Sequence, residues 1–212
     1  VGYQAPDPET RERVAEIRAI VRRYFSDMTR PEPRFQFVTD LSAAPPNTSD
    51  ERRIENDAPR FIYSYFGVFG DPLLDATLDP YPDGLLKRLA ACGVNGVWLH
   101  VVLRDLAPGG GAFPEFGNGH EQRLRHLQSL VTRAKALGIR VFLYMNEPRA
   151  QRPAFFAAPQ RQAMRGVQER GYIAMCTSNE SVRDWIRDAL TYVIRTVPDL
   201  GGVFTITASE NL

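Results

Sequence analysis

The sequence predicts an α/β fold of the (β/α)8 barrel type, with only the first four strands present in its 212 residues. Two observations predict it. Apolar stretches typical of buried strands alternate with amphipathic helical stretches, and a long polar loop follows each strand. Such loops fit a barrel better than an open doubly wound sheet, whose dinucleotide site needs a Gly-rich turn after the first strand. No GxGxxG or GxxxxGK[ST] pattern occurs.

The chain divides into two predicted parts. Residues 1–58 form an N-terminal helix, expected over 8–28, and a Pro-rich connector. Residues 59–212 form the first half of the barrel. Its expected strands are 61–66, 96–103, 139–145 and 203–207, and its expected helices are 83–92, 120–137 and 179–196.

An insertion, residues 146–177, separates the third expected strand from the last helix. Short helices are expected within it near 153–157 and 159–170. Thr177 and Glu180 have the spacing of a capping box, which predicts the start of the helix that follows. The loop containing Gly109–Gly111 reads as a lid rather than a phosphate cradle, because no lysine or helix cap follows it.

Composition excludes some classes of partner. The net charge is +1 and the basic residues are spread evenly, so no electrostatic footprint for nucleic acid or an anionic membrane exists. No apolar run reaches the length of a membrane span. Cys92 and Cys176 have no metal-ligand spacing and read as free thiols. We therefore expect no nucleic-acid partner, no membrane partner, no metal and no cofactor.

Polar residues follow each expected strand, and carboxyl ends of parallel strands are where ligands bind. They are Ser64 and Asp71, His100 and Asp105, Asn146 and Glu147, and Ser209 and Glu210. Some of them have a structural alternative: His100 as a core histidine, Asn146-Glu147-Pro148 as a plain turn, Asp71 as a loop former. Trp98 and Trp185 read as core residues.

From Pro59 to Glu210 the chain resembles the catalytic barrel of family 20 glycoside hydrolases, the β-N-acetylhexosaminidases. Asn95-Gly-Val-Trp-Leu-His100 has the spacing of that family's second strand, and Asp105 lies near its aspartate. Gly138-Ile-Arg-Val141, followed by Asn146 and Pro148, resembles the third-strand pattern. The resemblance implies a barrel, a carbohydrate site and a general acid at Glu210. Ser209, however, stands where the family has the aspartate that orients an acetamido group, so N-acetylhexosamine is not implied.

We therefore expect hydrolysis of O-glycosidic bonds, with Glu210 as general acid/base because partial desolvation at a strand end raises a carboxyl pKa. The second carboxylate is expected at Glu147 or beyond residue 212. The residues expected to bind substrate are His100, Asp105, Asn146, Arg149 and Ser209. Three alternatives stay open: a glycosidase of another barrel family, a non-catalytic carbohydrate-binding barrel, and an inactive fragment.

The expected partner is an oligosaccharide or glycoside, with a chain segment or a second chain completing the barrel. The first residue is Val rather than Met, which leaves the compartment open, although a secreted or periplasmic location is favoured over the cytoplasm.

Overall fold

The fold is described from a computed structural model, which covers residues 12, 15, 16, 19, 58–64, 70–75 and 78–206. The four positions between 12 and 19 are helical and exposed. The rest of the expected N-terminal helix, the connector up to residue 57, and the candidates Ser209 and Glu210 lie outside the described residues.

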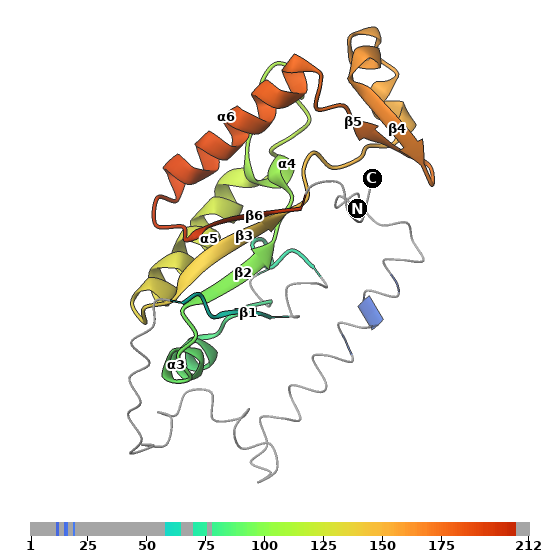
Figure 1. Cartoon of the computed structure of the whole chain (residues 1–212). Coiled ribbons are helices and arrows are strands. Elements are labelled where there is room, and N and C mark those ends of the chain that lie inside the picture. Colours follow the sequence, from blue (N-terminus) through green and yellow to red (C-terminus); the bar gives the residue numbers. More distant parts are fainter. Residues whose placement is uncertain are drawn as a thin grey trace.

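A parallel sheet forms the centre of the described chain (Figure 1). Its four described strands, β1 (Phe61–Tyr63), β2 (Gly96–His100), β3 (Arg140–Met145) and β6 (Gly202–Thr205), lie side by side in chain order. Every neighbouring pair is parallel. This alternation of parallel strands and helices confirms the predicted α/β fold. The sequential order is the one expected of the first half of a (β/α)8 barrel.

Helices cover one face of the sheet and form the core with it. They are α3 (Asp83–Ala91), α5 (His120–Lys135) and α6 (Glu180–Thr196). The strand residues that alternate toward this face, Val97, Leu99, Val141 and Leu143, are at most 1% exposed. They join one apolar cluster with Leu86 of α3, Leu127 of α5 and Val193 of α6. Burial of these side chains is the main stabilising term for the unit.

The opposite face of the sheet is aromatic. The register places Tyr63, Trp98 and Phe142 in one row across β1, β2 and β3. The Tyr63 and Trp98 rings are stacked with centroids 3.9 Å apart, and Phe61 lies 4.6 Å from Phe142 by the same measure. Phe61 is 37% exposed and Trp98 is half-buried. Trp98 was predicted to be a core residue. The structure places it on this aromatic face instead, outside the helix-covered core.

Strand β2 is shorter than predicted. The apolar run continues to Leu103, but the strand ends at His100 and a single helical turn, α4 (Leu103–Leu106), follows. Apolar periodicity cannot distinguish a buried strand from a buried turn of helix. What fixes the change is a long-range hydrogen bond, from Leu103 N to Glu147 Oε1 at 2.7 Å.

The insertion contains a hairpin that the sequence reading missed. After η3 (Pro153–Phe156) and η4 (Pro159–Met164), the chain forms β4 (Arg165–Glu169) and antiparallel β5 (Tyr172–Met175). The helix expected up to residue 170 is therefore wrong beyond Met164. Arg170 and Gly171 both have positive φ, 48° and 80°, which suits a tight hairpin turn.

The loop between α4 and α5, in which a lid is expected, is anchored at its base. Phe113 is fully buried, and its ring packs against Phe116, Phe155 and Trp185. The tip at Gly110, Gly111 and Ala112 is exposed, as are Pro114 and Glu115, which follow Phe113.

The start of α6 also differs from the prediction. Its N-cap is Asn179, whose side chain accepts a hydrogen bond from Val182 N at 3.4 Å, rather than Thr177. The expected capping box is therefore wrong. Within the described part of the chain, no helix is both long enough and apolar enough to cross a membrane.

Candidate active site

The described candidates gather at the carboxyl edge of the sheet. His100 is the last residue of β2, Asn146 and Glu147 directly follow β3, and Asp105 lies on α4 just beyond β2. Because β2 and β3 pair in parallel up to His100 and Tyr144, their carboxyl ends emerge side by side. The prediction that these strand ends converge thus agrees with the topology, while the roles of the side chains stay predictions.

Glu147 links the end of β3 to the start of α4. Its Oε1 accepts a hydrogen bond from Leu103 N at 2.7 Å, and its Oε2 accepts one from Arg149 N at 3.1 Å. Leu103 is the first residue of α4, and N–H groups of a first turn have no partner within their own helix. The carboxylate supplies that partner and closes the turn after β3.

Burial raises the pKa of Glu147 to about 7. Desolvation is the largest cause, because a buried carboxylate loses the hydration that stabilises its charge. The two backbone N–H groups and Arg104 act in the opposite direction, and Asp105 raises the pKa further. At neutral pH the group is therefore present in both protonation states, as a general acid or base requires.

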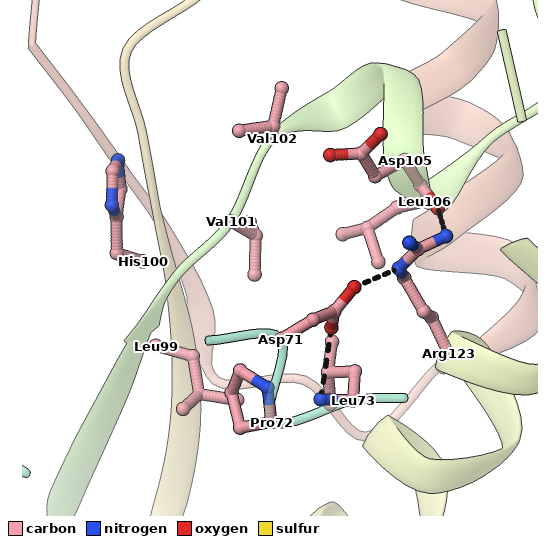
Figure 2. Close-up of a pocket in the computed structure, with 10 residues that line it drawn as sticks. All are labelled: Asp71, Pro72, Leu73, Leu99, His100, Val101, Val102, Asp105, Leu106 and Arg123. Atoms are coloured by element: carbon pink, nitrogen blue, oxygen red, sulfur yellow. Dashed lines mark hydrogen bonds and ion pairs between the residues drawn. The ribbon is translucent and has the colours of Figure 1, made fainter. Parts of the chain in front are cut away.

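Asp105 is the second carboxyl group at this edge. Burial raises its pKa, while the charges of Arg104 and Arg123 oppose the shift. Arg123 Nη1 donates to the Asp105 backbone oxygen at 3.1 Å and its Nε donates to Asp71 Oδ2 at 2.7 Å, as Figure 2 shows. Among the described residues, none donates a hydrogen bond to the Asp105 carboxylate, so this group remains available to a ligand.

His100 lies apart from the carboxyl groups. Its ring contacts Tyr144, with centroids 5.4 Å apart, and burial lowers its pKa, which favours the neutral imidazole. Val101 and Val102 lie between His100 and Asp105 in Figure 2. The structure therefore places His100 on the aromatic face near its carboxyl end, and no hydrogen bond joins it to Asp105 in the described chain.

The hollow that His100 and Asp105 line is small. It is lined by Asp71, Leu99, His100, Asp105 and Arg123 among others, and its volume is about 20 Å³. A water molecule needs roughly 10–15 Å³ by this measure, so the hollow holds about one water and no sugar ring.

Asn146 and Arg149 complete the described candidates. Asn146 is half-buried. Arg149 is 6% exposed, and burial lowers its pKa. At the end of β1, Ser64 is also buried, and no described residue forms a hydrogen bond with its Oγ. Its backbone N–H donates to Tyr81 Oη, which itself donates to Trp98 O at 2.6 Å, so this tyrosine ties β1 to β2.

The arginines that form ion pairs and hydrogen bonds around the candidate residues were not predicted from the sequence. Arg123 pairs with Asp71, and Arg104 Nη1 donates to Gln151 Oε1 at 2.7 Å. Asp71 was assigned to a loop, and its ion pair with α5 agrees with that structural role. No motif marks Arg123, because its partners lie up to 52 residues away along the chain. Among the described residues, no group of three His, Cys, Asp or Glu side chains could hold a metal ion.

The fold and the side chains at the carboxyl edge together define this chain as an α/β protein with titratable groups at the carboxyl ends of a parallel sheet. No protein-family model matches the chain, and no curated protein matches it. A solved structure, a noncanonic maltogenic α-amylase from Thermotoga neapolitana, is similar to it at 17% identity with a TM-score of 0.41. The similarity covers 60% of this chain and 34% of that one. The chain thus spans about a third of that enzyme's length.

Proposed function

We propose that this chain carries part of the active site of a glycoside hydrolase, acting on an oligosaccharide or glycoside at the carboxyl edge of the sheet. The observation that carries the proposal is Glu147, a half-buried residue at that edge whose carboxyl group has its pKa raised to about 7 by desolvation. Glycoside hydrolysis uses two carboxyl groups, one as proton donor and the other as base or nucleophile, and a carboxyl group with a pKa near 7 can act as an acid or as a base. Asp105 supplies a second carboxyl group nearby.

Glu147 can take part despite its two backbone hydrogen bonds. A carboxyl group has about four lone-pair sites, and Leu103 N and Arg149 N use two of them. The same bonds hold the group in one orientation, which favours proton transfer to a positioned oxygen.

Glu210 keeps the role of general acid/base at the end of the fourth strand, with Glu147 as the second carboxyl group. His100, Asp105, Asn146, Arg149 and Ser209 are proposed to bind the sugar. Membership of family 20 and the division at residue 58 belong to the same proposal, as does completion of the barrel by a further segment or a second chain.

The test is hydrolysis of a panel of 4-methylumbelliferyl glycosides. We expect Glu147→Gln and Glu210→Gln each to lower kcat by about 10²–10⁴, the usual effect of losing an acid/base group. Glu169→Gln, on exposed β4, is the control and should leave kcat unchanged. Circular dichroism checks that each variant is folded. Unchanged turnover in a folded Glu147→Gln protein would show that this carboxyl group has no catalytic role.

A second candidate is a carbohydrate-binding barrel without catalysis. The observation that favours it is that both Glu147 oxygens already accept backbone hydrogen bonds, as a purely structural carboxylate would. This protein would bind oligosaccharides in calorimetry but hydrolyse none of the panel. Glu147→Gln would then lower stability and leave sugar affinity unchanged at temperatures where it is folded.

A further inference from the structure

Arg149 is a buried cation, and no residue of the described chain is its counter-ion. It is 6% exposed, and its Nε has no hydrogen-bond partner among the described residues. Three other arginines with partly buried side chains are ion-paired: Arg123 with Asp71, Arg133 with Asp79 and Asp83, and Arg161 with Glu115. Arginine stays charged in proteins, and a buried charge is ordinarily paired. Within the described chain, Arg149 is the exception among these four.

The backbone of Arg149 is held firmly. Its N–H donates to Glu147 Oε2 at 3.1 Å, and its carbonyl oxygen accepts from Gln151 Nε2 at 2.9 Å. Gln151 is 4% exposed and exchanges two backbone hydrogen bonds with Ile173 of β5. The side chain of Arg149 therefore starts from a fixed main chain, so little ordering of the backbone is needed when a ligand binds.

The position of Arg149 points to the site. It lies four residues beyond β3, two residues from Glu147 and three from Asn146. No charged neighbour contributes to its pKa shift, which has burial as its cause. Arg149 therefore lies at the same carboxyl edge of the sheet as Glu147.

We propose that Arg149 binds the carboxylate of the substrate, so that the site takes an acidic sugar of the uronic acid type. This rests on the proposed glycoside hydrolase function and names its substrate class. A guanidinium presents a planar fork that matches a carboxylate with two parallel hydrogen bonds. One unpaired cation balances one negative charge, which suits a carboxylate better than a phosphate dianion.

The experiment compares an acidic and a neutral sugar in four proteins. These are wild type, Arg149→Met, which removes the charge, Arg149→Lys, which keeps it, and Arg165→Met on exposed β4 as control. Hydrolysis is measured with the 4-methylumbelliferyl glycosides of glucuronic acid and glucose. Thermal unfolding is measured with and without glucuronate or glucose, and this second measurement does not depend on catalysis.

We expect wild type to prefer the glucuronide and to be stabilised more by glucuronate than by glucose. Arg149→Met should lower the glucuronide-to-glucoside ratio of kcat/KM at least about tenfold, the effect of losing one charge-assisted pair, and should abolish the glucuronate shift. Without sugar it should unfold at or above the wild-type temperature, because an unpaired buried charge is gone. Arg149→Lys should keep part of the preference, and Arg165→Met all of it.

The outcomes separate this inference from the proposed function. Hydrolysis of both glycosides with a ratio that Arg149→Met leaves unchanged supports the hydrolase and overturns the acidic substrate. A glucuronate shift that depends on Arg149, without hydrolysis of any glycoside, supports the carboxylate contact and overturns the hydrolase. If Arg149→Met and Glu210→Gln each destabilise the sugar-free protein and their effects do not add, Glu210 is the counter-ion and the inference is wrong.

Discussion

Glu147 couples the protonation of the site to the stability of the fold. Its pKa is about 7 in the folded chain, against an ordinary value of 4.5. Between these values the folded state holds more protons than the unfolded state, so stability falls as pH rises. The contribution is fully present below pH 4.5, is lost as pH rises through about 7, and amounts to at most about 3 kcal/mol.

We predict that this pH dependence disappears in Glu147→Gln. The free energy of unfolding is measured in urea at pH 5 and pH 8 for both proteins. Wild type should lose up to about 3 kcal/mol more than the variant between the two values. Glu169→Gln, exposed on β4, should behave like wild type. Equal pH dependence in wild type and Glu147→Gln would mean that the pKa of this carboxyl group is not raised.

Among the candidate residues, those that depend on local sequence could be predicted and those that depend on long-range contacts could not. His100, Asn146 and Glu147 were found because each stands at the end of an apolar run that reads as a strand. The roles of Arg123 and Gln151 depend on hydrogen bonds to residues 52 and 47 positions away. The local sequence around a residue does not reveal a hydrogen-bond partner that is distant in the chain and comes close only in the folded structure.

At the scale of elements, the loop between α4 and α5 depends on one close backbone approach. A Cβ added at Gly109 would lie 1.8 Å from the carbonyl oxygen of Phe113, whereas one at Gly111 would meet no atom within 4 Å. Phe113 N also donates to Gly109 O, so the two residues close the base of the loop.

We predict that Gly109→Ala destabilises the protein by about 1–3 kcal/mol or more, because the backbone must shift to admit the methyl group. Gly111→Ala is the matched control and should change stability by no more than about 0.5 kcal/mol. Urea unfolding of both variants measures the difference. Equal stability of the two variants would show that the backbone at the base of the loop can shift without a loss of stability.

Elements with strong periodicity were predicted well. Helix α5 was expected over 120–137 and extends over His120–Lys135, because its apolar spacing is regular and a glycine follows. The hairpin of β4 and β5 was not expected, since β4 is exposed along its whole length and shows no apolar alternation. Pairing with β5, rather than burial, gives β4 its conformation.

At the scale of the whole molecule, the sheet has one covered face and one aromatic face. β1 and β6 are its edge strands in the described chain, and Phe61 of β1 is 37% exposed. Edge strands with unpaired backbone groups are templates for association, and exposed aromatic surface adds a driving force. The proposed completion of the barrel would pair the edge strands and cover the aromatic face.

We predict concentration-dependent association of the 212-residue protein at micromolar to millimolar concentrations, measured by analytical ultracentrifugation. Phe61→Lys should weaken it, because a lysine on an edge strand opposes pairing. Val167→Lys, at a position 69% exposed on β4, is the control and should leave association unchanged. A wild-type protein that remains monomeric throughout this range would mean that the aromatic face needs no partner.

The insertion between β3 and α6 is closed at its base. Gln151 and Ile173 exchange both backbone hydrogen bonds, at 2.9 and 2.8 Å, so the chain leaves and re-enters the barrel unit at one point. The path from β3 to α6 is therefore independent of what the hairpin tip contains. Residues around Arg170 and Gly171 are a place where an epitope or a fluorescent label can be added, since lengthening a surface turn by a few residues costs little entropy. Such a label would mark the hairpin without altering the strands of the four-stranded sheet.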